Sequence, residues 1–195
     1  MTETGVRSGT ARDRLLRAAA ILFYDEGIAA TGIDAITRRA GVAKQSLYNN
    51  FASKAELVAA YIDHRHREWL DLYARRARQA PTPVEKILAI FDAYGDHAEC
   101  AYERGFRGCG LLNAAAEFSS EDAGREAVRR HKEEVEAILV AQLAEILPDD
   151  LDRAQTLAAH LVFLLEGAMV RAGLEGSAER VGQARAMALQ MLDTL

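Results

Sequence analysis

Apolar residues recur three and four positions apart along most of this chain, which is the spacing of an amphipathic helix. Glycine and proline interrupt the pattern, and Ser, Thr or Asp residues that can cap a helix follow several of these interruptions. The first amphipathic segment lies between Thr10, a capping residue, and Gly27, which suits the end of a helix. Continued along the chain, this pattern predicts an all-α protein of about nine helices.

The helix boundaries follow from caps and breakers. Two Ser/Thr-x-x-Glu boxes, Ser53–Glu56 and Thr82–Glu85, mark the starts of two helices, and Ala80–Pro83 is the clearest linker. Glycines at 105, 108 and 110 break the pattern in the middle of the chain. We expect helices over residues 10–26, 31–40, 43–51, 53–78, 83–103, 111–118, 119–147, 151–172 and 178–193.

Composition and charge narrow the class of protein. The chain has 195 residues, half of them hydrophobic and 27% charged, which favours a folded core over disorder. It lacks an unbroken apolar run of about 18–20 residues, and its N-terminus is polar, so we expect a cytoplasmic protein without a membrane span. Residues 1–60 carry a net charge of +2 and residues 61–195 carry −7. This asymmetry suits a protein that contacts phosphate at one end.

The segment Lys44–Phe51 has a polar face that suits DNA recognition. Leu47 and Phe51 are four residues apart and should face the core. This leaves six side chains for another surface: Lys44, Gln45, Ser46, Tyr48, Asn49 and Asn50. Lys, Gln, Ser and Asn side chains can hydrogen-bond base edges, whereas Tyr48 and Lys54 suit phosphate oxygens. Spacing alone fits a short solvated helix equally well.

Over residues 10 to about 60, glycines, aromatic residues and caps fall in a specific register: Ala18-Ala19, Phe23, Gly27, Thr31, Ile36, Ala40-Gly41-Val42, Lys44, Leu47-Tyr48, Phe51 and Ser53-Lys54. In this register the segment resembles the N-terminal domain of the TetR family of bacterial transcriptional regulators. The resemblance implies an all-α homodimer whose two helix-turn-helix units, about residues 33–51 here, read an inverted repeat in double-stranded DNA.

The resemblance also assigns roles by position. It implies phosphate contacts from Thr31, Tyr48 and Lys54, and contacts at or near bases from Lys44, Gln45, Ser46 and Asn49. Two positions depart from the family pattern. Gly32 stands where the family often has Ser or Thr, and Asn50 stands where an aromatic residue or His is common, which alters the expected base preference there.

By the same resemblance, residues 61–195 bind a small-molecule effector and form the dimer. Aromatic residues, and polar residues within apolar stretches, are the candidate ligand contacts: Trp69, Phe91, Tyr94, His97, Leu112, Asn113, Glu117, Phe118, Phe163 and Glu166. Each of these side chains could equally belong to the core or bond a neighbouring helix. Apolar stripes on the last two helices suit a four-helix bundle made by two subunits, and a bundle within one chain is the alternative.

These observations predict a ligand-responsive DNA-binding regulator, by family default a repressor, and not an enzyme. The glycine-rich stretch at 105–110 follows no strand, and the chain lacks H-E-x-x-H, G-x-S-x-G and paired C-x-x-C motifs. We expect no metal and no cofactor beyond the effector. Two alternatives stay open. One is a redox or metal sensor that uses Cys100 and Cys109 with nearby histidines, and the other is a helical adaptor that has lost DNA binding.

Overall fold

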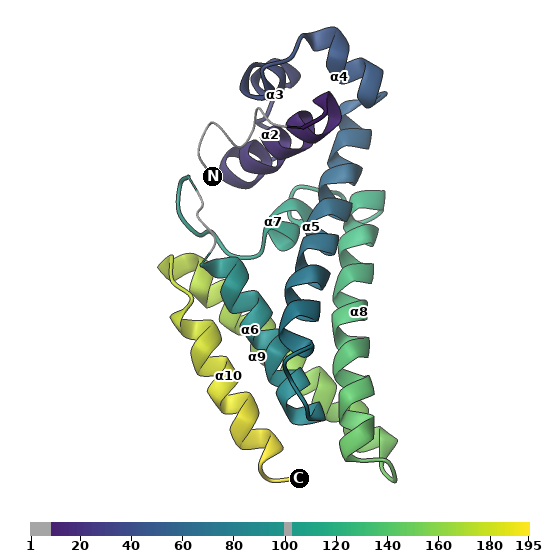
Figure 1. The fold of residues 1–195 in the computed structure, drawn as a ribbon, viewed down its shortest axis with the longest axis vertical. Coiled ribbons are helices and arrows are strands. Elements are labelled where there is room, and N and C mark those ends of the chain that lie inside the picture. Colours follow the sequence, from purple (N-terminus) through teal and green to yellow (C-terminus); the bar gives the residue numbers. More distant parts are fainter. Residues whose placement is uncertain (1–8, 100–102) are drawn as a thin grey trace. The chain divides into compact units, whose positions relative to one another are not determined.

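The computed structural model describes residues 9–99 and 103–195, and the regular structure of these residues is entirely helical, as predicted. Their nine helices are drawn in Figure 1: α2 (Ala11–Glu26), α3 (Ile33–Ala40), α4 (Lys44–Asn50), α5 (Lys54–Ala77), α6 (Pro83–Ala98), α7 (Gly110–Ala115), α8 (Ala123–Ile146), α9 (Leu151–Glu175) and α10 (Glu179–Leu192). They fall into two compact units. The described part of the first is 9–65, 103–105 and 110–128, and that of the second is 66–99, 106–109 and 129–195.

In the first unit, α2, α3 and α4 form a three-helix head. A capping box starts α2, because Thr10 Oγ1 accepts a hydrogen bond from the Asp13 N–H while the Asp13 carboxylate accepts one from the Thr10 N–H. The buried face of α2, which includes Leu15 and Phe23, packs against α3 and α4. Gly41, with a left-handed φ of 63°, ends α3 and turns the chain into α4. The head therefore has the predicted helix-turn-helix order.

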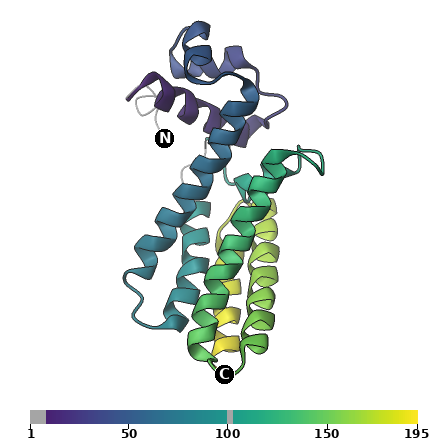
Figure 2. The same cartoon turned by 90° about the vertical axis from the view of Figure 1, so that its right-hand side faces the viewer.

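The second unit is a bundle of α6, α9 and α10 with parts of α5 and α8. α10 packs along both α6 and α9, and these three helices lie side by side in Figure 1 and Figure 2. On α8, Lys132 reaches two of the other helices, because its Nζ lies 2.7 Å from Oε1 of Glu166 on α9 and donates a hydrogen bond to Tyr94 on α6. On α5, the Trp69 ring lies 5.4 Å from that of Tyr94, which completes the bundle.

α9 is longer than predicted because Gly173 lies inside it and does not end it. A Cβ atom at Gly173 would lie 2.6 Å from Cα of Gly108, so the missing side chain allows two backbone segments of the second unit to touch. The helix ends at Gly176, whose φ is 66°. By length and composition α9 could cross a membrane, but core helices of folded proteins pass the same test, and eight of its residues are buried here.

Three other helix limits differ from the prediction. α6 ends at Ala98 instead of near 103, although residues 100–102 lie outside the described part of the chain. α7 ends at Ala115 instead of 118. α8 begins only at Ala123, where the Asp122 carboxylate accepts a hydrogen bond from the Gly124 N–H and thereby caps the helix. The remaining predicted limits agree with the structure to within about three residues.

Candidate nucleic-acid interface and effector site

α4 presents a polar face to solvent because two buried side chains fix its other face. Leu47 and Phe51 are 0% and 1% exposed and anchor the helix to the head. On the opposite side Lys44, Gln45 and Asn49 are exposed, and Tyr48 is 46% exposed. The polar face predicted from the sequence therefore exists in the fold, on the second helix of the helix-turn-helix.

Hydrogen bonds within the helix-turn-helix orient several of these side chains. The Gln45 amide donates to the Asn49 side-chain oxygen at 3.1 Å, so these two residues form one pair one helical turn apart. The Lys44 ammonium lies 2.9 Å from the Asp34 carboxylate, whose hydrogen bond and charge raise the Lys44 pKa and keep this lysine positive. The Asn50 amide instead donates to the Ser46 carbonyl oxygen at 2.7 Å, so this donor serves its own helix.

The predicted phosphate contacts divide into one exposed and two inward-bound side chains. Tyr48 is exposed, as a phosphate contact requires. Lys54 is half-buried, and its ammonium donates to the Ile28 carbonyl oxygen at 2.6 Å. Thr31, the third predicted phosphate contact, faces inward. Its side chain is 1% exposed, and its hydroxyl donates to the carbonyl oxygens of Gly27 and Leu22, so this hydroxyl closes a loop and does not face the surface.

In the second unit, polar groups gather around Lys132. Its ammonium lies 2.7 Å from Glu166 Oε1, 3.2 Å from the Tyr94 hydroxyl and 3.7 Å from Cys109 Sγ. Burial opposes the charged form of Lys132, but Cys109, Tyr94 and Glu166 together raise its pKa above the ordinary value. Burial also raises the pKa of Tyr94. The cluster is therefore a partly buried cation paired with a carboxylate and bordered by a neutral phenol.

Aromatic rings enclose one side of this cluster. The Trp69 ring stacks on that of Tyr73, with 5.7 Å between the ring centroids. Its centroid lies 5.4 Å from that of Tyr94 and 5.5 Å from that of His131. Burial, with help from Lys132 and His66, lowers the pKa of His131 to about 3, so this histidine is neutral at physiological pH. Trp69 Nε1 and Glu166 Oε2 are buried polar atoms without a hydrogen-bond partner among the described residues.

The structure brings together only some of the predicted ligand contacts. Trp69, Tyr94 and Glu166 join the Lys132 cluster, and Phe91 and His97 are buried on α6 of the same unit. Four others belong to the unit that contains the head: Leu112, Asn113, Glu117 and Phe118. Phe163 does not join the cluster's buried residues, because its side chain is 72% exposed on this protomer.

Glu117, another predicted ligand contact, is bound to the backbone of the first unit. Both of its carboxylate oxygens accept backbone hydrogen bonds, from Ile28 and from Ala29, so the group is already engaged within the first unit. Lys132 was absent from the predicted site, because it lies in a charged stretch that is typical of a solvated helix face. Cys109 is a buried thiol, and its possible disulfide partner Cys100 lies outside the described residues.

Comparison with known proteins identifies the class. The profile described as "Bacterial regulatory proteins, tetR family" matches residues 15–61, and the profile "Tetracyclin repressor-like, C-terminal domain" matches residues 83–188. A TetR-family transcriptional regulator from Streptomyces coelicolor superposes with a TM-score of 0.81 and 31% identity, over 92% of each chain. Another from Chloroflexus aurantiacus gives 0.79 and 26%, over 94% of each chain. The chain belongs to the TetR family, whose members are DNA-binding transcription regulators and not enzymes.

Two curated relatives match part of the chain. It is 35% identical over 95 residues to the HTH-type transcriptional repressor KstR2 of Mycolicibacterium smegmatis, which is 47% of this chain and 44% of that protein. It is 39% identical over 89 residues to the HTH-type transcriptional activator FasR of the same organism, which is 45% of this chain and 40% of that protein. The matches thus span less than half of each relative, and the two relatives regulate in opposite directions.

Proposed function

We propose that this protein is a cytoplasmic regulator that binds an inverted repeat in double-stranded DNA as a homodimer, represses transcription there, and leaves the DNA when a small-molecule effector binds. The observation that carries the proposal is the exposed polar face of α4, held outward by buried Leu47 and Phe51 on a helix-turn-helix head. A short helix of this kind fits the major groove, where base edges are read.

The exposed side chains of α4 suit the two kinds of DNA contact. Gln45 and Asn49 carry amides, which can bond adenine bidentately, and their mutual hydrogen bond orients them as a pair for neighbouring bases. Lys44 supplies a positive charge that can reach guanine or a phosphate. Tyr48 supplies a phosphate contact that sets the register of the helix on the duplex. These roles support DNA reading over a merely solvated helix face.

The dimer proposal rests on an exposed apolar stripe along α9. Phe163, Val170 and Leu174 are 72%, 55% and 79% exposed, and their spacing places them on one side of the helix together with Gly167. Met187 adds an exposed apolar side chain on α10. Soluble proteins rarely leave such a stripe uncovered, and the same stripe on a second copy would cover it in a twofold-symmetric bundle.

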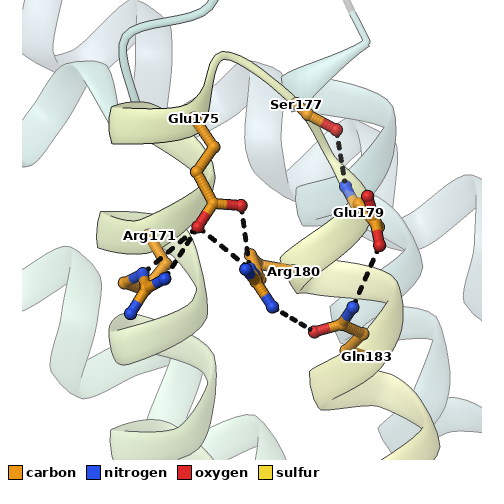
Figure 3. A network of polar contacts seen from close by, with 6 residues as sticks. All are labelled: Arg171, Glu175, Ser177, Glu179, Arg180 and Gln183. Carbon is orange, nitrogen blue, oxygen red and sulfur yellow. Dashed lines mark hydrogen bonds and ion pairs between the residues drawn. The ribbon is translucent and has the colours of Figure 1, made fainter.

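Ion pairs brace the turn between these two helices, as Figure 3 shows. Glu175, near the end of α9, accepts hydrogen bonds from Arg171 at 2.8 Å and from Arg180 on α10 at 2.8 Å. The hydrogen bonds from Arg180 and Arg171 lower the pKa of Glu175. Gln183 links Arg180 with Glu179, which extends the network along the start of α10. This bracing favours presentation of α9 and α10 to a partner as one surface.

The Lys132 cluster is the best-supported effector site. The unpartnered N–H of Trp69 calls for an acceptor, and the unpartnered oxygen of Glu166 calls for a donor, so a ligand that offers both would satisfy two buried polar atoms. The Trp69, Tyr73 and Tyr94 rings favour a ligand with a flat apolar part. Such an effector releases DNA only if it binds the DNA-free conformation more tightly, so effector and operator must weaken each other equally.

The test of the DNA-binding proposal is selection of bound fragments from the sheared genome of the source organism, with purified protein at about 150 mM salt, where non-specific phosphate binding is weak. We expect recovery of fragments that share an inverted repeat. A variant with Gln45 and Asn49 replaced by alanine keeps its charge and should recover none of them. Recovery of unrelated fragments only, or equal recovery by this variant, would refute sequence reading by α4.

A further inference from the structure

The loop between α2 and α3 is tied at successive backbone atoms. The Gly27 carbonyl accepts a hydrogen bond from the Thr31 hydroxyl at 2.6 Å, and the Ile28 carbonyl accepts one from the Lys54 ammonium at 2.6 Å. Because α3 follows directly, with Gly32 as its N-cap, this loop decides where the helix-turn-helix begins relative to α2. A change in the loop backbone therefore changes the placement of α3 and of the recognition helix that follows it.

Glu117 holds two neighbouring backbone N–H groups of this loop. One carboxylate oxygen accepts from the Ile28 N–H at 2.8 Å and the other from the Ala29 N–H at 2.7 Å, a bidentate and charge-assisted arrangement. The loop is shaped for the carboxylate. Gly27 has a φ of +93°, and a Cβ atom there would lie 3.1 Å from Glu117 Oε1. A side chain at Gly27 would therefore press against the carboxylate as well as strain the backbone.

Packing fixes the position of Glu117 within the first unit. At the start of α7, a Cβ atom on Gly110 would lie 3.1 Å from the Tyr24 ring and 3.2 Å from the Tyr61 hydroxyl, so α7 lies close against α2 and α5. At its other end, the Arg125 guanidinium donates to the Ala115 carbonyl at 3.1 Å. Glu117 thus reaches the head from a segment that matches the C-terminal profile, outside the helix-turn-helix sequence.

We propose that Glu117 is a positioning residue for DNA recognition: by holding the Ile28 and Ala29 N–H groups it sets the placement of α3 and α4 without touching DNA. This inference rests on the proposed operator binding. It also gives a means of control, because the chain passes from the second unit to the first between Cys109 and Gly110, and a shift of α7 that lengthened these two hydrogen bonds would release the loop.

The charge of Glu117 makes the test selective. Removing a carboxylate from a DNA-binding protein makes its net charge less negative, so long-range electrostatics alone predicts slightly tighter binding to any DNA. The positioning role predicts the opposite for operator DNA. The variants are Glu117→Ala, which removes both acceptors, and Glu117→Gln, which keeps one amide oxygen. Glu121→Gln is the matched control, because this exposed glutamate lies in the same segment and its replacement changes the charge equally.

Two readouts are needed. Hydrogen exchange at the Ile28 and Ala29 amides reports the contact directly and needs no DNA. Binding to a recovered inverted-repeat fragment and to a scrambled fragment reports recognition. We expect Glu117→Ala to speed exchange at both amides and to weaken operator binding by roughly tenfold, while binding to scrambled DNA stays equal or tightens. Tenfold converts to about 1.4 kcal/mol, which lies within the range of stability that loss of a side chain–backbone cap costs. Glu117→Gln should be intermediate, and Glu121→Gln should match the wild type.

Unchanged exchange at both amides in Glu117→Ala would overturn the contact itself. Faster exchange at both amides in Glu117→Ala, together with wild-type affinity for operator DNA, would overturn the positioning role. Equal weakening of binding to operator and scrambled DNA would overturn it as well. If the wild-type protein bound no inverted repeat at all, the proposed function would fail instead, and the exchange readout would still decide whether Glu117 holds the loop. Partial rescue by glutamine separates the positioning role from a general loss of folding, which should affect both variants alike.

Discussion

Replacement of Lys132 by methionine tests whether the polar cluster of the second unit is a buried ion pair. The lysine side chain is 17% exposed and that of Glu166 is 26% exposed, and their charged atoms lie 2.7 Å apart. Breaking a fully buried pair costs about 3–5 kcal/mol, because the remaining charge loses its partner. Since part of each side chain is open to water here, we expect a smaller loss, about 2–3 kcal/mol.

The double variant Lys132→Met/Glu166→Met gives the sharper result. It removes both charges and leaves side chains of similar length, so its free energy of unfolding should return to within about 1 kcal/mol of the wild type. Urea denaturation followed by tryptophan fluorescence is the assay, because the chain has one tryptophan, Trp69, whose ring lies 5.4 Å from Tyr94 in this unit. Additive losses in the double variant would refute the ion pair and would leave the Lys132 cluster without its central interaction.

Three further predictions concern other parts of the protein. Because the His131 pKa is about 3 in the fold, against an ordinary 6.5, the stability that its neutral form contributes is complete above pH 6.5 and is lost as the pH falls toward 3, by up to about 1.4 kcal/mol per pH unit. The free energy of unfolding of His131→Asn, measured at pH 7 and pH 5, should therefore change less with pH than that of the wild type, and parallel pH profiles would contradict this. Gly173→Ala should destabilise the protein by about 1–3 kcal/mol because its Cβ meets the Gly108 backbone, whereas Gly95→Ala on α6, with open space around its Cβ, should stabilise it by up to about 1 kcal/mol. Thermal unfolding compares the two variants, and a stability change of the same sign in both would refute the close approach. Leu174→Glu should yield monomers in sedimentation velocity. Leu151→Glu should remain dimeric, because Leu151 is also exposed but lies about 120° away around α9 from Phe163; a dimer in both cases would place the interface elsewhere.

Local sequence signals predicted the helices and the recognition face well, since the groups involved are near neighbours in sequence. The Thr10–Asp13 and Thr82–Glu85 boxes and the glycines that end α2 and α3 lie within a few residues of the structure they create. The buried positions of α4, Leu47 and Phe51, followed from a four-residue spacing. Each of these features could be derived before any tertiary contact was known.

Contacts between distant parts of the chain could not be derived in this way. The family resemblance assigns Thr31 to phosphate, but in the structure its hydroxyl closes a loop whose path depends on the whole head. Glu117 bonds residues 89 and 88 positions away, and its sequence context suggests only a polar side chain in an apolar stretch. Gly173 resembled a helix end, because the close approach to Gly108 that requires it depends on the packing of the bundle. The ion pair of Lys132 with Glu166 could not be predicted, because Lys132 lies among other charged residues that are typical of a solvated helix face.

In the proposed function, two copies of the α4 face read one inverted repeat. A hydroxyl-radical footprint of the protein on a recovered genomic fragment tests this most directly, combined with the mass of the complex. We expect two protected half-sites whose centres lie about one DNA turn apart, roughly 34–36 Å, or a whole number of turns apart, with two protomers per repeat. A single protected patch, protection spread without sequence preference, or one protomer per site would contradict it.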